Sequence, residues 1–151
     1  MQLNPYLNFN GNCEEALNFY ANALGAKVEC LIRHEGTPAE QHTPKEWHQK
    51  VMHGRVNLNG QILMASDCPP DRYHQPQGFS VTLNTKEPAE AERVYAALAD
   101  GGKVCMPIAE TFWAKRFGMV TDRFGTPWMI NCEKAAMDLT EMEDCTAGAA
   151  R

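Results

Sequence analysis

The sequence predicts an α+β protein of two βαβββ modules that together form a cupped eight-stranded mixed sheet. The first observation is an internal repeat, because FYANALGAKV (19–28) and VYAALADGGKV (94–104) match except for one extra residue before the glycine. The second is that each half of the chain carries the same succession of patterns, a strand, a helix and three strands. A four-stranded sheet with one helix leaves a face uncovered, so we expect the halves to combine, with helices on the convex side and a cavity within.

The composition is that of a soluble globular protein. The chain has 151 residues, of which 44% are hydrophobic and 22% charged, and its net charge is -5. The acidic balance argues against a nucleic-acid partner, and no apolar run approaches the roughly 20 residues that a membrane helix needs. The N-terminal residues lack a signal-peptide pattern. Because the six cysteines contain no CxxC pair, we expect reduced thiols and a cytoplasmic protein.

The first module is predicted over residues 3–66. Its expected elements are strands at 3–9, 27–33, 51–58 and 61–66 and a helix at 13–24. Asn12 has the position of an N-cap, with Glu15 at capping-box spacing, and Gly25 ends the helix. Asn59-Gly60 is a strong hairpin signal between the last two strands. The polar stretch 34–49 is expected to form a surface excursion or flap.

The second module is predicted over residues 78–133, after a proline-rich linker at 67–77. Its expected elements are strands at 79–85 and 103–106, a strand ending near 120, a strand at 127–132, and a helix from 88 to 100. Asp122 to Gly125 supplies the turn before the last strand. Residues 134–151 have no counterpart in the first half, and we expect a frayed helix or a disordered tail there.

The strand, the Asp-x-x-Gly turn and the final apolar strand resemble the closing hairpin of the vicinal oxygen chelate superfamily, which includes glyoxalase I, extradiol dioxygenases and bleomycin-resistance proteins. The segment TFWAKRFGMVTDRFGTPWMIN (111–131) is similar to the PhnB-like branch, whose members often carry a 3-demethylubiquinone methyltransferase-like label. The resemblance covers residues 3–133 and implies a glyoxalase/bleomycin-resistance-like fold. It also implies a homodimer, since relatives often complete cavities across a dimer and an uncovered sheet edge favours pairing.

Metal-dependent relatives take His, Glu or Gln ligands from the first and fourth strand of each module. The resemblance places these positions on or near Pro5, Met64, Phe79 and Met129, which are poor ligands for a hard divalent ion. A shift of one residue gives no better set, so we expect no metal and no cofactor. His53 alternates with core residues and is either a core histidine or a polar group that faces the cavity. It is the candidate catalytic residue of an enzyme.

The cavity is expected to be apolar, aromatic and rich in methionine. The residues placed on its concave face are Leu7, Phe9, Ile62, Met64, Phe79, Val81 and Met129. The candidate ligand-binding residues are Tyr6, His53, Met64, Phe79, Phe112, Trp113, Arg116 and Met129. Each apolar residue also fits a role in core packing. Lys115 and Arg116 beside Trp113 suit an anionic end of a ligand, or a solvated strand end.

Three functional hypotheses follow from these patterns. The first is a small-molecule binding protein with an apolar or aromatic ligand and no bound metal. The alternative is a metal-dependent lyase, isomerase or dioxygenase-type enzyme that uses a non-standard site. The third is a structural or regulatory dimer whose cavity is filled by its own side chains. No GxGxxG motif follows a strand, so neither a dinucleotide fold nor an S-adenosylmethionine fold is indicated.

Overall fold

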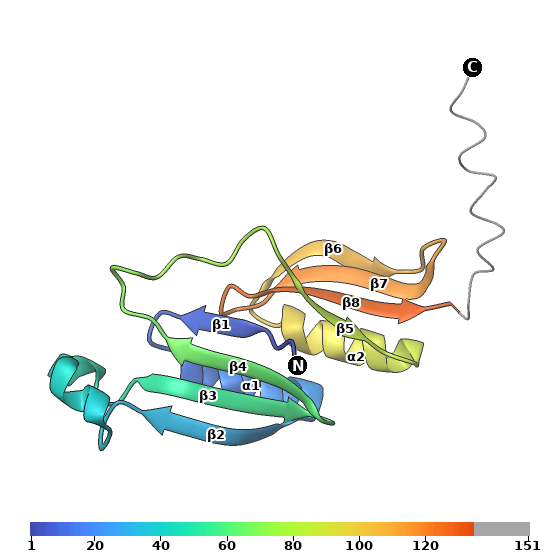
Figure 1. Cartoon of the computed structure of the whole chain (residues 1–151). Helices are drawn as coiled ribbons and strands as arrows, with labels where there is room; N and C mark the ends of the chain where they lie inside the picture. Colours follow the sequence, from blue (N-terminus) through green and yellow to red (C-terminus); the bar gives the residue numbers. More distant parts are fainter. Residues whose placement is uncertain (135–151) are drawn as a thin grey trace.

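The computed structural model describes residues 1–134, and the tail predicted over 134–151 lies outside the described residues except for Lys134 (Figure 1). The elements in chain order are β1 (Tyr6–Phe9), α1 (Cys13–Leu24), β2 (Lys27–Arg33), η1 (Pro38–His42), η2 (Lys45–Trp47), β3 (Val51–Leu58), β4 (Gln61–Asp67), β5 (Val81–Asn84), α2 (Pro88–Ala99), β6 (Lys103–Ala109), β7 (Ala114–Thr121) and β8 (Pro127–Glu133). The 3-10 helices η1 and η2 occupy the predicted excursion. None of the helices within residues 1–134 is long and apolar enough to span a bilayer.

The α+β class and the repeated βαβββ plan are confirmed, but the predicted single eight-stranded sheet is wrong. The strands form two four-stranded mixed sheets, ordered β1-β4-β3-β2 (sheet A) and β5-β8-β7-β6 (sheet B). In each sheet the first strand pairs in parallel with the last one, and the remaining pairs are antiparallel. The repeat in the sequence is therefore a repeat of topology.

Local sequence signals place most of the turns. Gly25 follows α1 with φ 66°, and Asn59 and Gly60 have φ values of 51° and 91°, as a type I′ hairpin turn requires. The predicted Asn12 cap makes no side-chain hydrogen bond. Instead, the Cys13 amide donates to Asp67 Oδ1 at 2.9 Å, so a carboxylate 54 residues away serves the start of α1.

Each helix covers one face of its own sheet, and the two helices also touch each other. The Arg93 guanidinium of α2 donates to the Ala23 carbonyl of α1 at 2.9 Å. Residues buried beneath both sheets form one continuous core around the helices (Figure 1). Gly54 allows α1 to approach sheet A closely, since a Cβ there would lie 2.3 Å from Leu17 Cδ1, and Gly118 plays the same part beneath Tyr95 of α2.

The face of each sheet opposite its helix, called here the open face, points away from the shared core. Leu7 and Phe9 were predicted on the concave face, but they are only 2% exposed and pack in the core with the helices, as the partly buried Val81 also does. Their neighbours Tyr6 and Asn8 are the exposed residues of β1. Leu7 and Phe9 therefore face the helices and not the open face of sheet A.

Candidate functional site

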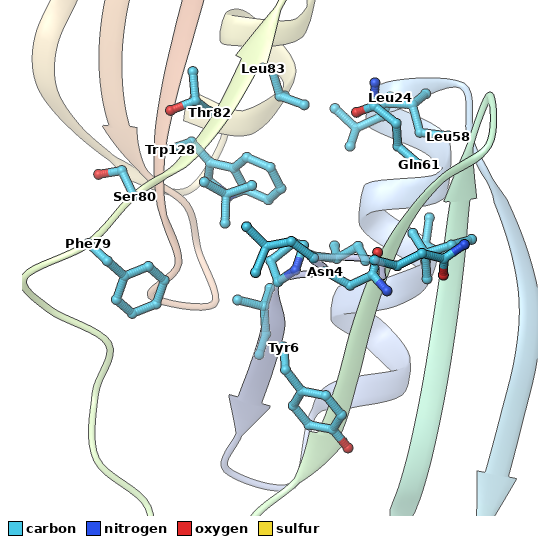
Figure 2. A pocket seen from close by; sticks show the side chains of 18 of the residues that line it. Asn4, Tyr6, Leu24, Leu58, Gln61, Phe79, Ser80, Thr82, Leu83 and Trp128 are labelled. Atoms are coloured by element: carbon cyan, nitrogen blue, oxygen red, sulfur yellow. The ribbon is translucent and has the colours of Figure 1, made fainter.

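A hollow between the two modules is called here the inter-module pocket. Its volume is about 850 Å³, within the range of small-molecule sites. Figure 2 shows it between β1, β3 and β4 on one side and β5 and β8 on the other. Its lining comprises Gln2, Leu3, Asn4, Pro5, Tyr6, Leu7, Leu24, Val56, Leu58, Gly60, Gln61, Ile62, Leu63, Phe79, Ser80, Val81, Thr82, Leu83 and Trp128.

The pocket lies where the short first strand of the first module leaves part of β4 uncovered. β1 and β5 have four residues each, whereas β4 and β8 have seven. β1 pairs only with Met64 to Asp67 of β4, so the preceding residues 61–63 have no strand beside them on that edge, and they line the pocket. Gln2 to Pro5 approach the same space without joining the sheet.

The lining is electrically neutral. It contains thirteen aliphatic, aromatic or proline side chains in addition to polar amides and hydroxyls, and no Asp, Glu, Lys, Arg or His. Figure 2 places the amides of Asn4 and Gln61 on one side and the hydroxyls of Ser80 and Thr82 on the other. Such a site suits an uncharged apolar body with a few hydrogen-bonding groups.

One wall of the pocket is fixed by a buried carboxylate. Asp122, 4% exposed, accepts hydrogen bonds from the Tyr20 hydroxyl at 2.7 Å and from Trp128 Nε1 at 2.8 Å. It also accepts from the backbone amides of Phe124 at 2.8 Å and Thr126 at 3.0 Å. Burial, reinforced by the carboxylate, raises the pKa of the Tyr20 hydroxyl, so this hydroxyl remains a proton donor. The indole of Trp128 is thereby locked in place.

The open face of sheet A brings together three of the predicted ligand-binding residues. Tyr6 lies directly beside Met64 in the parallel register. Its hydroxyl reaches across β4 to His53 Nδ1, at 3.4 Å, and the two rings are 6.0 Å apart. His53 therefore lies on the open face of the sheet, and not in the core. His53 is half-buried there, so the core position is wrong, and its role as a group that faces a cavity stays a prediction.

The open face of sheet B carries a second group. Met129 lies opposite Met119, and the rings of Trp113 and Phe117 are 5.5 Å apart. Phe112, 75% exposed, stacks edge-on against Trp113 at 4.7 Å. These residues line no part of the inter-module pocket.

Arg116 points the other way, toward the helix side of sheet B. Its Nε donates to Glu92 of α2 at 2.5 Å. In a single chain the predicted site is thus divided among three places. Tyr6 and Phe79 line the inter-module pocket, His53 and Met64 lie beside Tyr6 on sheet A, and the remainder lies on sheet B.

Sequence reasoning missed several walls of the pocket, notably Leu24, Leu58, Leu83 and Trp128. Each falls in a periodic apolar pattern that is indistinguishable from core packing. The available signal was Pro5, which restricts the start of β1 and so leaves the edge of β4 open.

The strand positions that carry metal ligands in metal-dependent relatives do not fit a divalent cation here. Open-face residues of β1 and β4 include Tyr6, Asn8, Ile62, Met64 and Ser66, and those of β5 and β8 include Thr82, Asn84, Met129, Asn131 and, at the end of β8, Glu133. This set holds no histidine and a single carboxylate, that of Glu133. Within residues 1–134, no three His, Cys, Asp or Glu side chains are grouped as a metal site requires.

Comparison with known proteins gives a family match across most of the chain. Residues 1–131 match the family model described as 3-demethylubiquinone-9 3-methyltransferase. Protein YjdN from Escherichia coli K12 is 37% identical over 145 residues, which cover 89% of this chain and 97% of YjdN.

Solved structures agree with this match. Protein PA1353 from Pseudomonas aeruginosa is 46% identical, with a TM-score of 0.81 over 89% of this chain and 99% of that one. The PhnB protein from Bacillus cereus is 25% identical, with a TM-score of 0.74 over 87% of this chain and 99% of that one. The fosfomycin resistance protein FosX from Listeria monocytogenes is 10% identical, with a TM-score of 0.61 over 89% of this chain and 94% of FosX, a likeness of fold alone.

Proposed function

Since the chain belongs to the 3-demethylubiquinone-9 3-methyltransferase family, the PhnB-like branch of the vicinal oxygen chelate superfamily, we propose that it is a small-molecule binding protein whose ligand has an apolar or aromatic body. The observation that carries this proposal is the neutral inter-module pocket of about 850 Å³. The proposed ligand-binding residues within it are Tyr6 and Phe79, together with Leu24, Leu58 and Trp128. We propose further ligand contacts on the open faces, made by Met64, Phe112, Trp113 and Met129. Arg116 can contact a ligand only after its hydrogen bond to Glu92 is broken.

The family's description names a methyltransferase, but the pocket supports a different role. S-adenosylmethionine carries a sulfonium cation and a zwitterionic amino acid, which proteins hold with charged groups or with backbone groups at a helix N-terminus. The lining offers no charged side chain. We therefore base the proposal on binding, and methyl transfer has no support from these residues.

The test uses Trp128 as a reporter inside the pocket. The changes Trp47→Phe and Trp113→Phe leave Trp128, which is 1% exposed, as the only tryptophan. Titration with the uncharged dye Nile red should give a saturable change in the fluorescence of Trp128. Leu83→Phe, which adds bulk inside the pocket, should weaken binding by about tenfold or more, since overpacking costs about 1–3 kcal/mol.

The matched control is Ile32→Phe, because Ile32 is 40% exposed on β2 and lies outside the lining. It should leave binding unchanged. A Trp128 signal that never saturates, with Nile red or with a panel of apolar aromatic compounds, would contradict the proposal.

We also propose that two chains associate and that the protein works in the cytoplasm. β6 is an edge strand, and its Val104 and Met106 are 48% and 43% exposed. Such an edge favours pairing with a partner. Sedimentation equilibrium should give the mass of a dimer, and Met106→Lys should lower it. Within residues 1–134 all five cysteines are free thiols, which suits a reducing compartment. Fractionation of cells should recover the protein with the cytoplasm.

A second candidate function, an enzyme with a non-standard site, depends on the contact between Tyr6 and His53. The described residues do not fit the metal that such chemistry needs in relatives. Elemental analysis of protein purified without a metal-affinity tag tests this reading. One equivalent of zinc, nickel, iron or manganese per chain, lost on His53→Ala, would overturn the metal-free proposal.

A further inference from the structure

Arg55 of β3 differs from the other arginines in helices and strands. Arg33, Arg93 and Arg116 each donate a hydrogen bond of 2.9 Å or less. Arg55 donates none within residues 1–134, and its Nε is inaccessible to solvent and has no acceptor. The nearest carboxylate oxygen, of Glu29, lies 3.8 Å from Nη2, beyond hydrogen-bond distance.

This arrangement leaves an unsatisfied donor. Glu29 does not supply the missing acceptor, since one of its oxygens lies 3.8 Å from Nη2 and the other accepts from Asn57 Nδ2 at 2.6 Å. The Arg55 side chain is 41% exposed as a whole, but its Nε is inaccessible to solvent, and an inaccessible donor without an acceptor points to an absent water or ligand. A guanidinium is best satisfied by an oxyanion, which can accept two of its N–H groups together.

Further polar side chains share the open face of sheet A with Arg55. His53 lies two residues earlier on the same strand, and it is opposite Ser66 in a register where Gly54 faces Ala65. Arg55 faces Met64, which in turn lies beside Tyr6. The side chains of Tyr6, Ser66, His53 and Arg55 therefore lie on the same face of neighbouring strands, where the Tyr6 hydroxyl contacts His53 Nδ1 at 3.4 Å.

The patch is continuous with the inter-module pocket. Tyr6 belongs to both, and so does Ile62, the neighbour of Met64 on the open face of β4. Figure 2 shows Tyr6 on β1 with its ring directed away from Leu24 and Leu58, at the lower margin of the pocket. A ligand whose body fills the neutral pocket could thus extend a polar group past Tyr6 toward Arg55.

We propose that Arg55, with Tyr6, His53 and Ser66, binds an oxyanion, the carboxylate head group of the ligand whose apolar body occupies the inter-module pocket. This inference rests on the proposed function and narrows the ligand class to lipophilic organic acids. The pocket supplies apolar contact without charge, and the open face supplies the donors.

The test compares two probes of nearly equal shape, 1-naphthaleneacetate and the neutral 1-naphthaleneacetamide, by calorimetry at pH 7.5. A hydrogen bond to a charged group is strong enough to favour the acid by about tenfold to a hundredfold. Arg55→Met should reduce this preference to about one while leaving amide binding unchanged. Arg33→Met is the matched control, because it removes the same charge from a residue paired with Glu14, and it should retain the preference.

The outcomes separate this inference from the proposed function. Equal affinity of the wild-type protein for the two probes would overturn the oxyanion site and leave the pocket intact. If neither probe binds, the pocket function fails, and a second measurement decides the oxyanion site. In a nitrogen-15 spectrum of the wild-type chain, acetate should shift the Arg55 Nε–H signal saturably. A signal that does not move would overturn the site, as would a carboxylate preference that survives Arg55→Met.

Discussion

Replacing Asp122 with alanine should remove much of the protein's stability. Trp128 Nε1 and the amides of Phe124 and Thr126 lose their acceptor, whereas the Tyr20 hydroxyl keeps Thr126 Oγ1 at 2.9 Å. A buried donor left without an acceptor costs about 1–3 kcal/mol. Three such donors, of which water can reach some, predict a loss of about 3–6 kcal/mol in the free energy of unfolding, a large share of a typical domain's stability.

Two further substitutions grade the effect. Asp122→Asn keeps one acceptor oxygen but turns an amide toward Trp128, whose indole can only donate, so one bond is lost at about 1–3 kcal/mol. Asp100→Asn is the control, because Asp100 pairs with Arg123 on the surface and its side chain is 76% exposed. Loss of an exposed pair should cost less than about 1 kcal/mol.

The assay is urea unfolding at pH 7, followed by tryptophan fluorescence, with all four proteins measured together. The expected order of stability is wild type, Asp100→Asn, Asp122→Asn and Asp122→Ala. If Asp122→Ala unfolds within about 1 kcal/mol of the wild type, the size of an average point mutation, the reasoning is refuted. The four hydrogen bonds would then not be what holds α1 against the β7–β8 turn.

The remaining predictions concern pH and packing. Burial, with the carboxylates of Asp67 and Glu14, raises the pKa of the Cys13 thiol above its ordinary 9.0, and burial with Asp122 raises that of Tyr20 above its ordinary 10.0. As pH rises, the unfolded chain therefore loses these protons before the folded chain does. The free energy of unfolding measured in urea should be constant below about pH 9 and decrease above it, by up to about 1.4 kcal/mol per pH unit for each group. Cys13→Ala should remove the part of this fall between pH 9 and 10. If the free energy of unfolding of Cys13→Ala falls with pH as steeply as that of the wild type, the assignment to Cys13 is wrong. Gly54→Ala should cost about 1–3 kcal/mol because its Cβ would meet Leu17. The same change made in a Leu17→Ala background should cost less, and additive losses in that double-mutant cycle would contradict the close approach.

The sequence predicted the elements better than it predicted their faces. Turns at Gly25, Asn59-Gly60 and Gly125 depend on local backbone conformation, which the residues themselves determine. The face assignment failed at Leu7 and Phe9 because alternation separates two sides of a strand without saying which side meets the helix. The apolar side packs in the core, which leaves Tyr6 and Asn8 on the open face. The prediction instead assigned the apolar side of β1 to the cavity, which put Leu7 and Phe9 on the wrong face.

Other features were beyond local reasoning because they join distant residues. Asp67 caps α1 across 54 positions, and Tyr20 meets Asp122 across 102. At the start of α1, for example, the local sequence indicated Asn12 as the cap, but the carboxylate of Asp67 takes that role. Buried polar residues at strand ends and turns are the positions where a chain of this length most needs a partner, and only the fold identifies that partner.

The inter-module pocket follows from the duplication itself. Each module begins with a four-residue strand that covers only part of the last strand in its sheet. Beside β1 this shortfall leaves Gln61 to Leu63 of β4 uncovered, and these residues line the pocket where the two modules meet. A motif search cannot find such a site, because no motif contains it. The lining of the pocket is neutral because residues suited to burial seldom carry a charge. A charged group of a ligand must then be recognised by a neighbouring surface, such as the open face of sheet A that carries Arg55.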